Sequence, residues 1–282
     1  MKQRIITAFI LIAIILPIIL IGGIPFLVAI TLLLAGAMYE LTNVNKSPLI
    51  TKIFTTLMVC CSSVYSYLNL DKPFANFNLL FVILPILGCF TIALFNKKST
   101  LLDACYNSII TIILSLFAAS LMELRNAFGN ANLILYTFIV TTTVDTFALF
   151  IGSKFGKHKL NERISPKKSI EGSIGGIVGG TLCGVLFATF FPILTDGNIN
   201  FLNMSLSENI IWINVLYTFL ITLLLSVAGQ IGDLIFSMIK RNYQIKDFSN
   251  LLPGHGGLAD RIDSLCINSI VLSLILSLAL IL

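Results

Sequence analysis

The chain has 282 residues, of which 57% are hydrophobic and only 11% are charged, and its formal net charge is +5. A soluble domain of this length cannot bury so much apolar surface, and the apolar runs reach about 18 residues or more, the length that spans a membrane. We therefore expect an integral membrane protein. A β-barrel is excluded because its strands alternate apolar and polar residues, whereas these runs are continuous.

Turn residues and charges divide the apolar runs into about nine spans, so the expected fold class is all-α, a polytopic bundle of transmembrane helices. A cleaved signal peptide is the alternative for the first run. That run exceeds the usual signal core of about 7 to 15 residues and no A-x-A-like site follows it, so we interpret it as a span. The predicted spans are residues 5–22, 25–41, 49–70, 79–95, 104–122, 132–152, 173–194, 210–239 and 264–282.

The basic residues indicate the orientation of the spans. With a cytoplasmic N-terminus, all of the 18 Lys and Arg residues except Lys72 and Arg125 fall in cytoplasmic segments. The positive-inside rule explains this asymmetry, so we expect a protein of the cell's inner or plasma membrane with its polar site facing the cytoplasm. Nucleic acid is excluded as a partner, since no soluble domain large enough to read a duplex is present.

We expect two regions along the chain. Residues 1–130 form an N-terminal transmembrane region of about five spans. Residues 131–282 form a C-terminal catalytic region, because the unusual polar residues gather in its cytoplasmic loops, residues 152–172 and 240–263.

The first loop ends in Ser165-Pro166-Lys167-Lys168, just before a helix that we expect to start near Ser169 or Gly172. The proline fixes the turn and aims two adjacent cations at the helix start, which suits a grip on phosphates. The earlier lysines of this loop are explained equally well as a solvated juxtamembrane segment.

The eighth span carries polar residues along one helical face. Asp233, Ser237, Lys240 and Arg241 stand at i, i+4, i+7 and i+8. A carboxylate near the membrane is expensive unless it is paired or binds an ion, which indicates a functional role. The alternative is a contact from Asp233 to Lys240 or Arg241 that only closes the helix end. This span exceeds the bilayer thickness, so its second half should emerge from the membrane.

The stretch LPGHGGLADRIDS, residues 252–264, concentrates charge behind a Pro-Gly turn. Gly256 and Gly257 leave backbone N–H groups accessible to a phosphate. Asp260 and Asp263 follow at the start of the last helix, where carboxylates also serve as ordinary caps. Together with Asp233 on the previous helix they indicate hard oxygen ligands for Mg²⁺, whose other positions substrate phosphates fill. Such a site suits phosphoryl or nucleotidyl transfer at a membrane surface.

Two further features stay open. The glycines of the seventh span have small-xxx-small spacing, which is typical of close helix packing and leaves a homodimer through this face as an option. Asp145 is a second intramembrane acid, which either lines the same cavity or pairs with a loop lysine.

At these residues the chain resembles the phosphatidate cytidylyltransferases, also called CDP-diacylglycerol synthases. ISPKKSIEG resembles the family's I-S-P-K-K-T-W-E-G with Ser169 and Ile170 substituted, and DTFA at 145–148 resembles its D-x-x-A element. The resemblance is strongest over residues 145–264. The family signature S-x-x-K-R-x4-K-D-x4-[L/I]-P-G-H-G-G-x-x-D-R-x-D is matched by Ser237, Lys240, Arg241, Lys246, Asp247, Pro253, Gly254, His255, Gly256, Gly257, Asp260, Arg261 and Asp263.

The resemblance implies that CTP and phosphatidate give CDP-diacylglycerol and pyrophosphate. It implies that Asp233 and Asp260 hold Mg²⁺ with Asp263 in support, and a second cation such as K⁺ is left open. The implied catalytic residues are Asp233, Lys240, Arg241, Asp260 and Arg261. The implied substrate-binding residues are Lys167, Lys168, Ser237, Lys246, His255, Gly256 and Gly257.

Two other functions are weighed against this one. A CTP- or ATP-dependent lipid or polyprenol kinase also needs Mg²⁺ and a basic cytoplasmic face. An ion-coupled transporter would use Asp145 and Asp233 as an intramembrane relay, although no internal repeat is evident.

Overall fold

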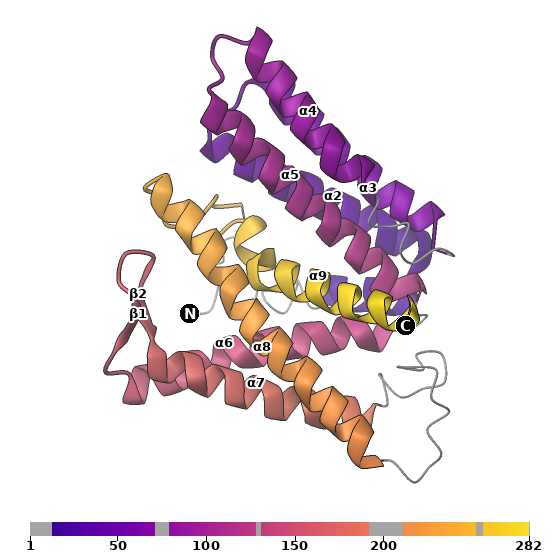
Figure 1. Ribbon diagram of the computed structural model, residues 1–282, viewed down its shortest axis with the longest axis vertical. Helices are drawn as coiled ribbons and strands as arrows, with labels where there is room; N and C mark the ends of the chain where they lie inside the picture. The colour runs from indigo at the N-terminus through magenta and orange to yellow at the C-terminus, as the bar shows by residue number, and fades with distance from the viewer. Residues whose placement is uncertain (1–12, 71–78, 128–130, 192–210, 252–255, 282) are drawn as a thin grey trace. The chain divides into compact units, whose positions relative to one another are not determined.

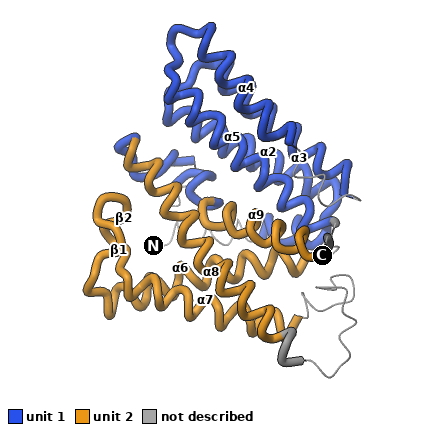
Figure 2. The backbone as a smooth tube through the Cα atoms, in the orientation of Figure 1, with its two compact units in different colours: residues 1–129, 243–262 blue, residues 130–242, 263–282 orange. Residues whose placement is uncertain are grey.

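The computed structural model describes residues 13–70, 79–127, 131–191, 211–251 and 256–281. These residues form two compact units (Figure 2): unit 1 comprises residues 1–129 and 243–262, and unit 2 comprises residues 130–242 and 263–282. Helices make up almost all of the described elements (Figure 1), so the predicted all-α membrane bundle is confirmed. The elements are α2 (Gly23–Val44), α3 (Leu49–Leu68), α4 (Leu80–Phe95), α5 (Leu101–Met122), the π-helix η2 (Glu123–Ala127), α6 (Ala131–Phe155), β1 (Lys159–Asn161), β2 (Ser165–Ser169), α7 (Ile170–Phe190), α8 (Ile211–Asn242) and α9 (Ala259–Ile281).

Seven helices of the described chain are long and apolar enough to cross a membrane, and α4 is apolar but shorter. Their bounds follow the predicted spans closely because composition alone decides which segments lipid can solvate. The predicted first span, residues 5–22, falls partly outside the described residues, and residues 13–21 of it are helical. The count of about nine spans and the cytoplasmic N-terminus stay predictions.

Helix α8 confirms the expectation of a segment longer than the bilayer. It has 32 residues, which at 1.5 Å per residue gives about 48 Å. The hydrocarbon core is only about 30 Å thick. A helix of this length exceeds the apolar layer, and the emergence of its last turns, with Lys240 and Arg241, stays a prediction.

In unit 1 the helices α2, α3 and α4 pack around α5, which is the most buried of these four helices. Thr100 begins α5 with a capping box: its hydroxyl accepts from the Asp103 N–H at 3.2 Å, and the Asp103 carboxylate accepts from the Thr100 N–H at 2.8 Å. Both donors would otherwise lack a partner at the helix start. The core of this unit includes Phe26, Leu34 and Phe117, each at most 1% exposed.

The 243–262 segment of unit 1 begins at a tyrosine that ties it to α2 and α5. The Tyr243 hydroxyl donates to Asn45 Oδ1 at 2.8 Å, and its ring meets the Tyr106 ring edge-on with centroids 5.3 Å apart. Burial, together with the nearby Asp103 carboxylate, raises the pKa of the Tyr243 phenol. The phenol therefore stays protonated and remains a donor at neutral pH.

Glycines of α7 allow α6 and α7 to pack closely in unit 2. A side chain at Gly176 would meet the Val144 carbonyl oxygen at 2.8 Å, and one at Gly172 would meet the Ala148 carbonyl oxygen at 2.7 Å. Gly180 and Gly184 face Ser226 and Thr222 of α8. The predicted close packing is confirmed. This glycine face is buried inside unit 2, so the idea that it forms a dimer face is wrong, while dimerisation itself stays a prediction.

Helix α8 lies close to the backbone of α9 at Gly232. A Cβ at this position would lie 2.9 Å from the Asp263 carbonyl oxygen and 2.9 Å from the Ile267 side chain. Backbone cannot retreat as a flexible side chain can. The next residue along α8 is Asp233, so the glycine sets the spacing beside that acid.

We expect Gly232→Ala to lower the thermal unfolding midpoint in detergent. Helix propensity alone predicts the opposite sign, a gain of about 1 kcal/mol for replacing glycine within a helix. The steric conflict with α9 should outweigh that gain, since overpacking costs about 1–3 kcal/mol. Ile231→Ala, at the exposed neighbouring position, is the control and should change the midpoint much less. A midpoint raised by Gly232→Ala would show that α9 is not held at this contact.

The loop between α6 and α7 contains an antiparallel ribbon that the sequence analysis did not predict. Strands β1 and β2 pair with Lys159 opposite Ser169 and Asn161 opposite Ser165. Ser169 ends β2 and caps α7, where its hydroxyl accepts from the Gly172 N–H at 3.1 Å. The predicted helix start near Ser169 is therefore confirmed, and Lys167 and Lys168 lie on a strand rather than in a turn.

Candidate active site

Lys168 and Asp233 form an ion pair in unit 2 that joins β2 to α8. Successive residues of a strand point to opposite faces, so Lys168 turns toward α8 while Lys167 is exposed. The side chains of the pair are only 30% and 21% exposed. The two adjacent cations expected to act together are thus separated, and one of them already neutralises the intramembrane acid.

Asp233 is the centre of a cluster of charges in unit 2. Its Oδ1 accepts a hydrogen bond from the Ser237 hydroxyl at 3.2 Å, one turn along α8 as the spacing predicted. The Asp263 carboxylate lies within electrostatic range of Asp233, Asp145 and Lys240. Of the two interpretations of Asp145, this arrangement favours the one that places it at the same site. Three carboxylates and two ammonium groups therefore lie close together in unit 2: those of Asp145, Asp233, Asp263, Lys168 and Lys240.

The donor set of this cluster fits a hard divalent cation. Carboxylate oxygens are the ligands that Mg²⁺ prefers, and it is usually bound by one or two carboxylates together with substrate phosphates and water. Among the described residues no three His, Cys, Asp or Glu side chains form a group that could hold a metal by themselves.

Arg241 ties the end of α8 to the ribbon. Its Nε donates to the Ile164 carbonyl oxygen at 3.1 Å, and the residue is otherwise exposed. Ile164 lies in the turn between β1 and β2. The guanidinium therefore positions the strand that carries Lys168, in addition to the phosphate contact that the sequence predicts.

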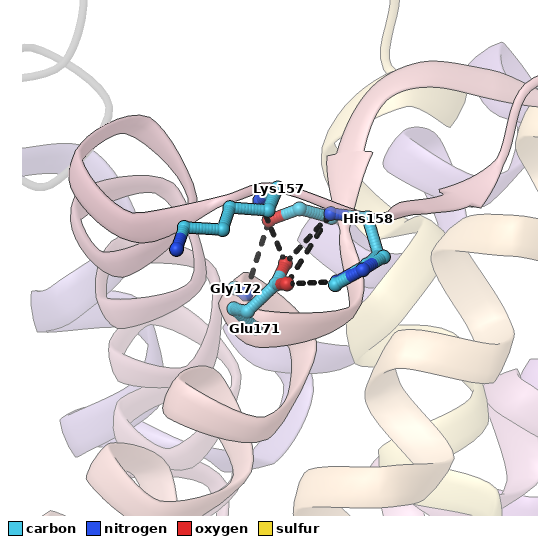
Figure 3. Close-up of polar contacts among 5 residues, drawn as sticks. Lys157, His158, Glu171 and Gly172 are labelled. Atoms are coloured by element: carbon cyan, nitrogen blue, oxygen red, sulfur yellow. Dashed lines mark hydrogen bonds and ion pairs between the residues drawn. The ribbon is translucent and has the colours of Figure 1, made fainter.

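Glu171, in the first turn of α7, makes a set of contacts that the sequence analysis did not predict. Figure 3 shows Lys157 and His158 arranged around its carboxylate. It accepts from the backbone N–H of Lys157 at 3.1 Å and of His158 at 3.2 Å, and from His158 Nδ1 at 2.6 Å. A carboxylate at a helix N-terminus is also stabilised by the helix dipole. Its place in the ISPKKSIEG stretch was the available signal.

In unit 1, Asp260 stabilises the stretch that precedes it. Its Oδ2 accepts from the backbone N–H of Phe248 and of Gly257, both at 2.9 Å, and the residue is 8% exposed. Gly256 has φ +81°, a left-handed conformation that favours glycine. In this structure the Gly257 N–H thus donates to Asp260, and a phosphate would have to compete with that carboxylate for the N–H group.

Glu40 of α2 is a second residue that the sequence analysis missed. Its Oε1 accepts from the Ser249 hydroxyl at 2.6 Å and the Leu258 N–H at 3.0 Å, and its Oε2 accepts from the Ala259 N–H at 3.0 Å. Hydrogen bonds to a charged group contribute about 1.5–3 kcal/mol each. Glu40 is 5% exposed, so these bonds also compensate for its burial.

The remaining predicted residues fall as follows. Lys246 and Arg261 are exposed in unit 1, and Gly256 is half-buried there. His255 lies outside the described residues. Asp260 belongs to unit 1, whereas Asp233 and Asp263 belong to unit 2. The convergence of Asp233 and Asp260 on one ion therefore stays a prediction.

Comparison with known proteins identifies the family. The model of the cytidylyltransferase family matches residues 2–279. The chain belongs to the cytidylyltransferase family. Membership confirms the resemblance drawn from the signature and makes the chain a nucleotidyltransferase.

Individual relatives agree with the family match. The chain is 32% identical to the phosphatidate cytidylyltransferase of Bacillus subtilis (strain 168) over 271 residues, 94% of this chain and 93% of the relative. It is 32% identical to that of Staphylococcus haemolyticus (strain JCSC1435) over 94% of each chain. For Staphylococcus aureus (strain COL) the identity is 30%, again over 94% of each chain.

Proposed function

We propose that this cytidylyltransferase transfers the cytidylyl group of CTP to phosphatidate. A phosphate oxygen of phosphatidate bonds to the α-phosphorus of CTP, the bond between the α-phosphorus and its bridging oxygen breaks, and pyrophosphate leaves with that oxygen. The products are CDP-diacylglycerol and pyrophosphate. The observation that carries the proposal is the match of nearly the whole chain to relatives that bear this name.

The charge cluster of unit 2 supports this chemistry. Lys168 and Lys240 supply positive charge beside the carboxylates of Asp233 and Asp263, which suits a triphosphate that arrives with a cation. Ser237 orients Asp233 through its hydroxyl. The phosphate of phosphatidate is largely ionised at neutral pH, so no general base is required. Alignment and charge neutralisation are the main contributions that the chain must make.

We propose Mg²⁺ as the cofactor, held by Asp233 and Asp260 with Asp263 in support, and a second cation such as K⁺ remains an option. Held by these carboxylates, Mg²⁺ would supply positive charge for the triphosphate oxygens and for the leaving pyrophosphate. Before substrate binds, the chain's own cations neutralise its acids. In the structure Lys168 pairs with Asp233, so we expect this pair to open on binding.

We also propose the location of the reaction. The helices identify an integral membrane protein. The positive-inside rule, applied to the basic loops, favours an active site on the cytoplasmic side of the inner or plasma membrane. Phosphatidate would then reach the site from the surrounding membrane lipids. A homodimer stays a proposal that needs a face other than the glycines of α7.

A lipid-dependent CTP assay tests the function. Purified protein with CTP, phosphatidate and Mg²⁺ should release pyrophosphate and form CDP-diacylglycerol, and EDTA should stop turnover until Mg²⁺ is restored. Release of a nucleoside diphosphate instead would indicate a lipid kinase. Substrate flux across proteoliposomes without CTP turnover would indicate a transporter, and either result would overturn the proposal.

A further inference from the structure

We propose that Glu40, in the N-terminal half of the chain, is a positioning residue for the reaction, and this rests on the proposed function. It acts through the 243–262 segment of unit 1, which carries Asp260 and Arg261. The contacts of Glu40 join α2 to residues more than 200 positions later in the chain.

The carboxylate of Glu40 holds the segment at two places. Ser249 is bound near one side of the Pro-Gly-His-Gly-Gly stretch, while Leu258 and Ala259 are bound at the other. Tyr243 adds a third attachment to the end of α2 through Asn45. The C-terminal part of α2 thus holds the segment at its first residue, at Ser249 and at the start of α9.

The chemistry of the contact explains why a carboxylate is needed. The first N–H groups of a helix have no partner within the helix, and those of Leu258 and Ala259 point to Glu40 at the start of α9. A negative charge there is also stabilised by the helix dipole. An amide side chain of the same shape offers only one oxygen, so it cannot accept all three donors.

The position of the bonded groups connects Glu40 to the reaction. Glu40 accepts a hydrogen bond from the backbone N–H of Ala259, the residue before Asp260. This hydrogen bond fixes the direction in which the Asp260 and Arg261 side chains leave the first turn of α9. Asp260 then accepts the Phe248 and Gly257 N–H groups and closes the segment from its other side. Gly257 is also confined, because a Cβ there would lie 2.5 Å from Glu40 Oε2.

Helix α9 transmits this placement along its own axis. It runs without a break from Ala259 to Ile281, and Asp263 lies one turn after Asp260. The rotation of the first turn about the helix axis decides where the Asp260 side chain points. Glu40 therefore sets the orientation of Asp260 and Arg261, two predicted site residues of its own unit, without needing to touch substrate.

The test compares Glu40→Gln, Glu40→Asp and Ser249→Ala with the control Thr42→Val. Thr42 is also buried on α2, but its hydroxyl bonds only to the Met38 and Tyr39 carbonyl oxygens of the same helix. We expect Glu40→Gln to lower kcat about tenfold, because small misplacements of catalytic groups are costly. KM for CTP should stay within about threefold, since substrate contacts are retained. Glu40→Asp, which keeps both oxygens, should recover part of the loss.

Hydrogen exchange separates positioning from general destabilisation. Peptides that contain Leu258 and Ala259 should exchange faster in Glu40→Gln, while peptides from α3 and α5 exchange as in the unsubstituted protein. Glu40→Gln and Ser249→Ala should be less than additive in kcat, because they remove the same contact. Equal acceleration in α3 and α5, or an unchanged kcat with faster exchange, would overturn the proposal.

The proposed function can fail separately from this inference. If the unsubstituted protein forms no CDP-diacylglycerol, the function is wrong, and the role of Glu40 in that reaction falls with it. If it is active and Glu40→Gln matches Thr42→Val in both kcat and exchange, the function stands and only the positioning role is wrong.

Discussion

Asp233→Asn should reduce CDP-diacylglycerol formation to near background, a loss of at least about 10²–10³-fold in kcat, as expected when a group that organises transition-state charge is removed. The substitution keeps the shape of the side chain and removes its charge. Lys168 then loses its ion-pair partner, and the Ser237 hydroxyl loses a charged acceptor. Turnover is measured with purified protein, CTP, phosphatidate and saturating Mg²⁺.

A matched control shows whether the loss is specific to the site. Glu162→Gln removes a carboxylate from an exposed position in the ribbon turn of the same unit and should leave turnover unchanged. Both variants should elute from size-exclusion chromatography as the unsubstituted protein does, because Asp233 is only one of the contacts of α8. Normal turnover in Asp233→Asn would remove the Mg²⁺ assignment.

The helices were predictable because lipid imposes a simple requirement. A segment in the bilayer must satisfy its backbone internally and present apolar side chains, so composition and length define it. The α7 start at Ser169 was predictable for a local reason, since a hydroxyl before a helix accepts a free N–H. Both features depend on residues that are close in the sequence.

The partners of the polar residues were not predictable in the same way. The sequence offered Lys240 or Arg241, both about two turns away on α8, as the alternative partners of Asp233. The structure pairs Asp233 with Lys168, 65 positions earlier. That pairing depends on the β1–β2 ribbon, whose strands are too short to show an alternating pattern. Local spacing therefore indicated the candidate groups but not their contacts.

Glu40 shows the same limit more strongly. On α2 it is one acid near the end of an apolar span, and its neighbours in the sequence indicate nothing about its role. Its donors lie on a segment more than 200 positions away. Only the contacts between α2 and the 243–262 segment reveal that both oxygens of the buried Glu40 carboxylate accept hydrogen bonds.

Lys168 and Lys167 should differ sharply when each is replaced by methionine, although the sequence presents them as one dibasic pair. Methionine keeps most of the side-chain length and removes the charge. We expect Lys168→Met to lower kcat/KM for CTP about 10²-fold, because this ammonium lies beside the acids of the site. Lys167→Met should lower it no more than about fivefold, since Lys167 is exposed on the opposite face of β2, where solvent weakens the interactions of its charge.

Salt distinguishes the two lysines further. Interactions of an exposed charge are screened beyond a Debye length of about 10 Å at 0.1 M and about 3 Å at 1 M salt. The effect of Lys167→Met should therefore shrink as NaCl is raised, whereas that of Lys168→Met should persist because its contact with Asp233 is partly shielded from water. Steady-state kinetics for CTP at low and high NaCl measure both. A larger loss for Lys167→Met at both salt concentrations would mean that the triphosphate binds on the other face of the ribbon, and that the pair of Lys168 with Asp233 serves the fold alone.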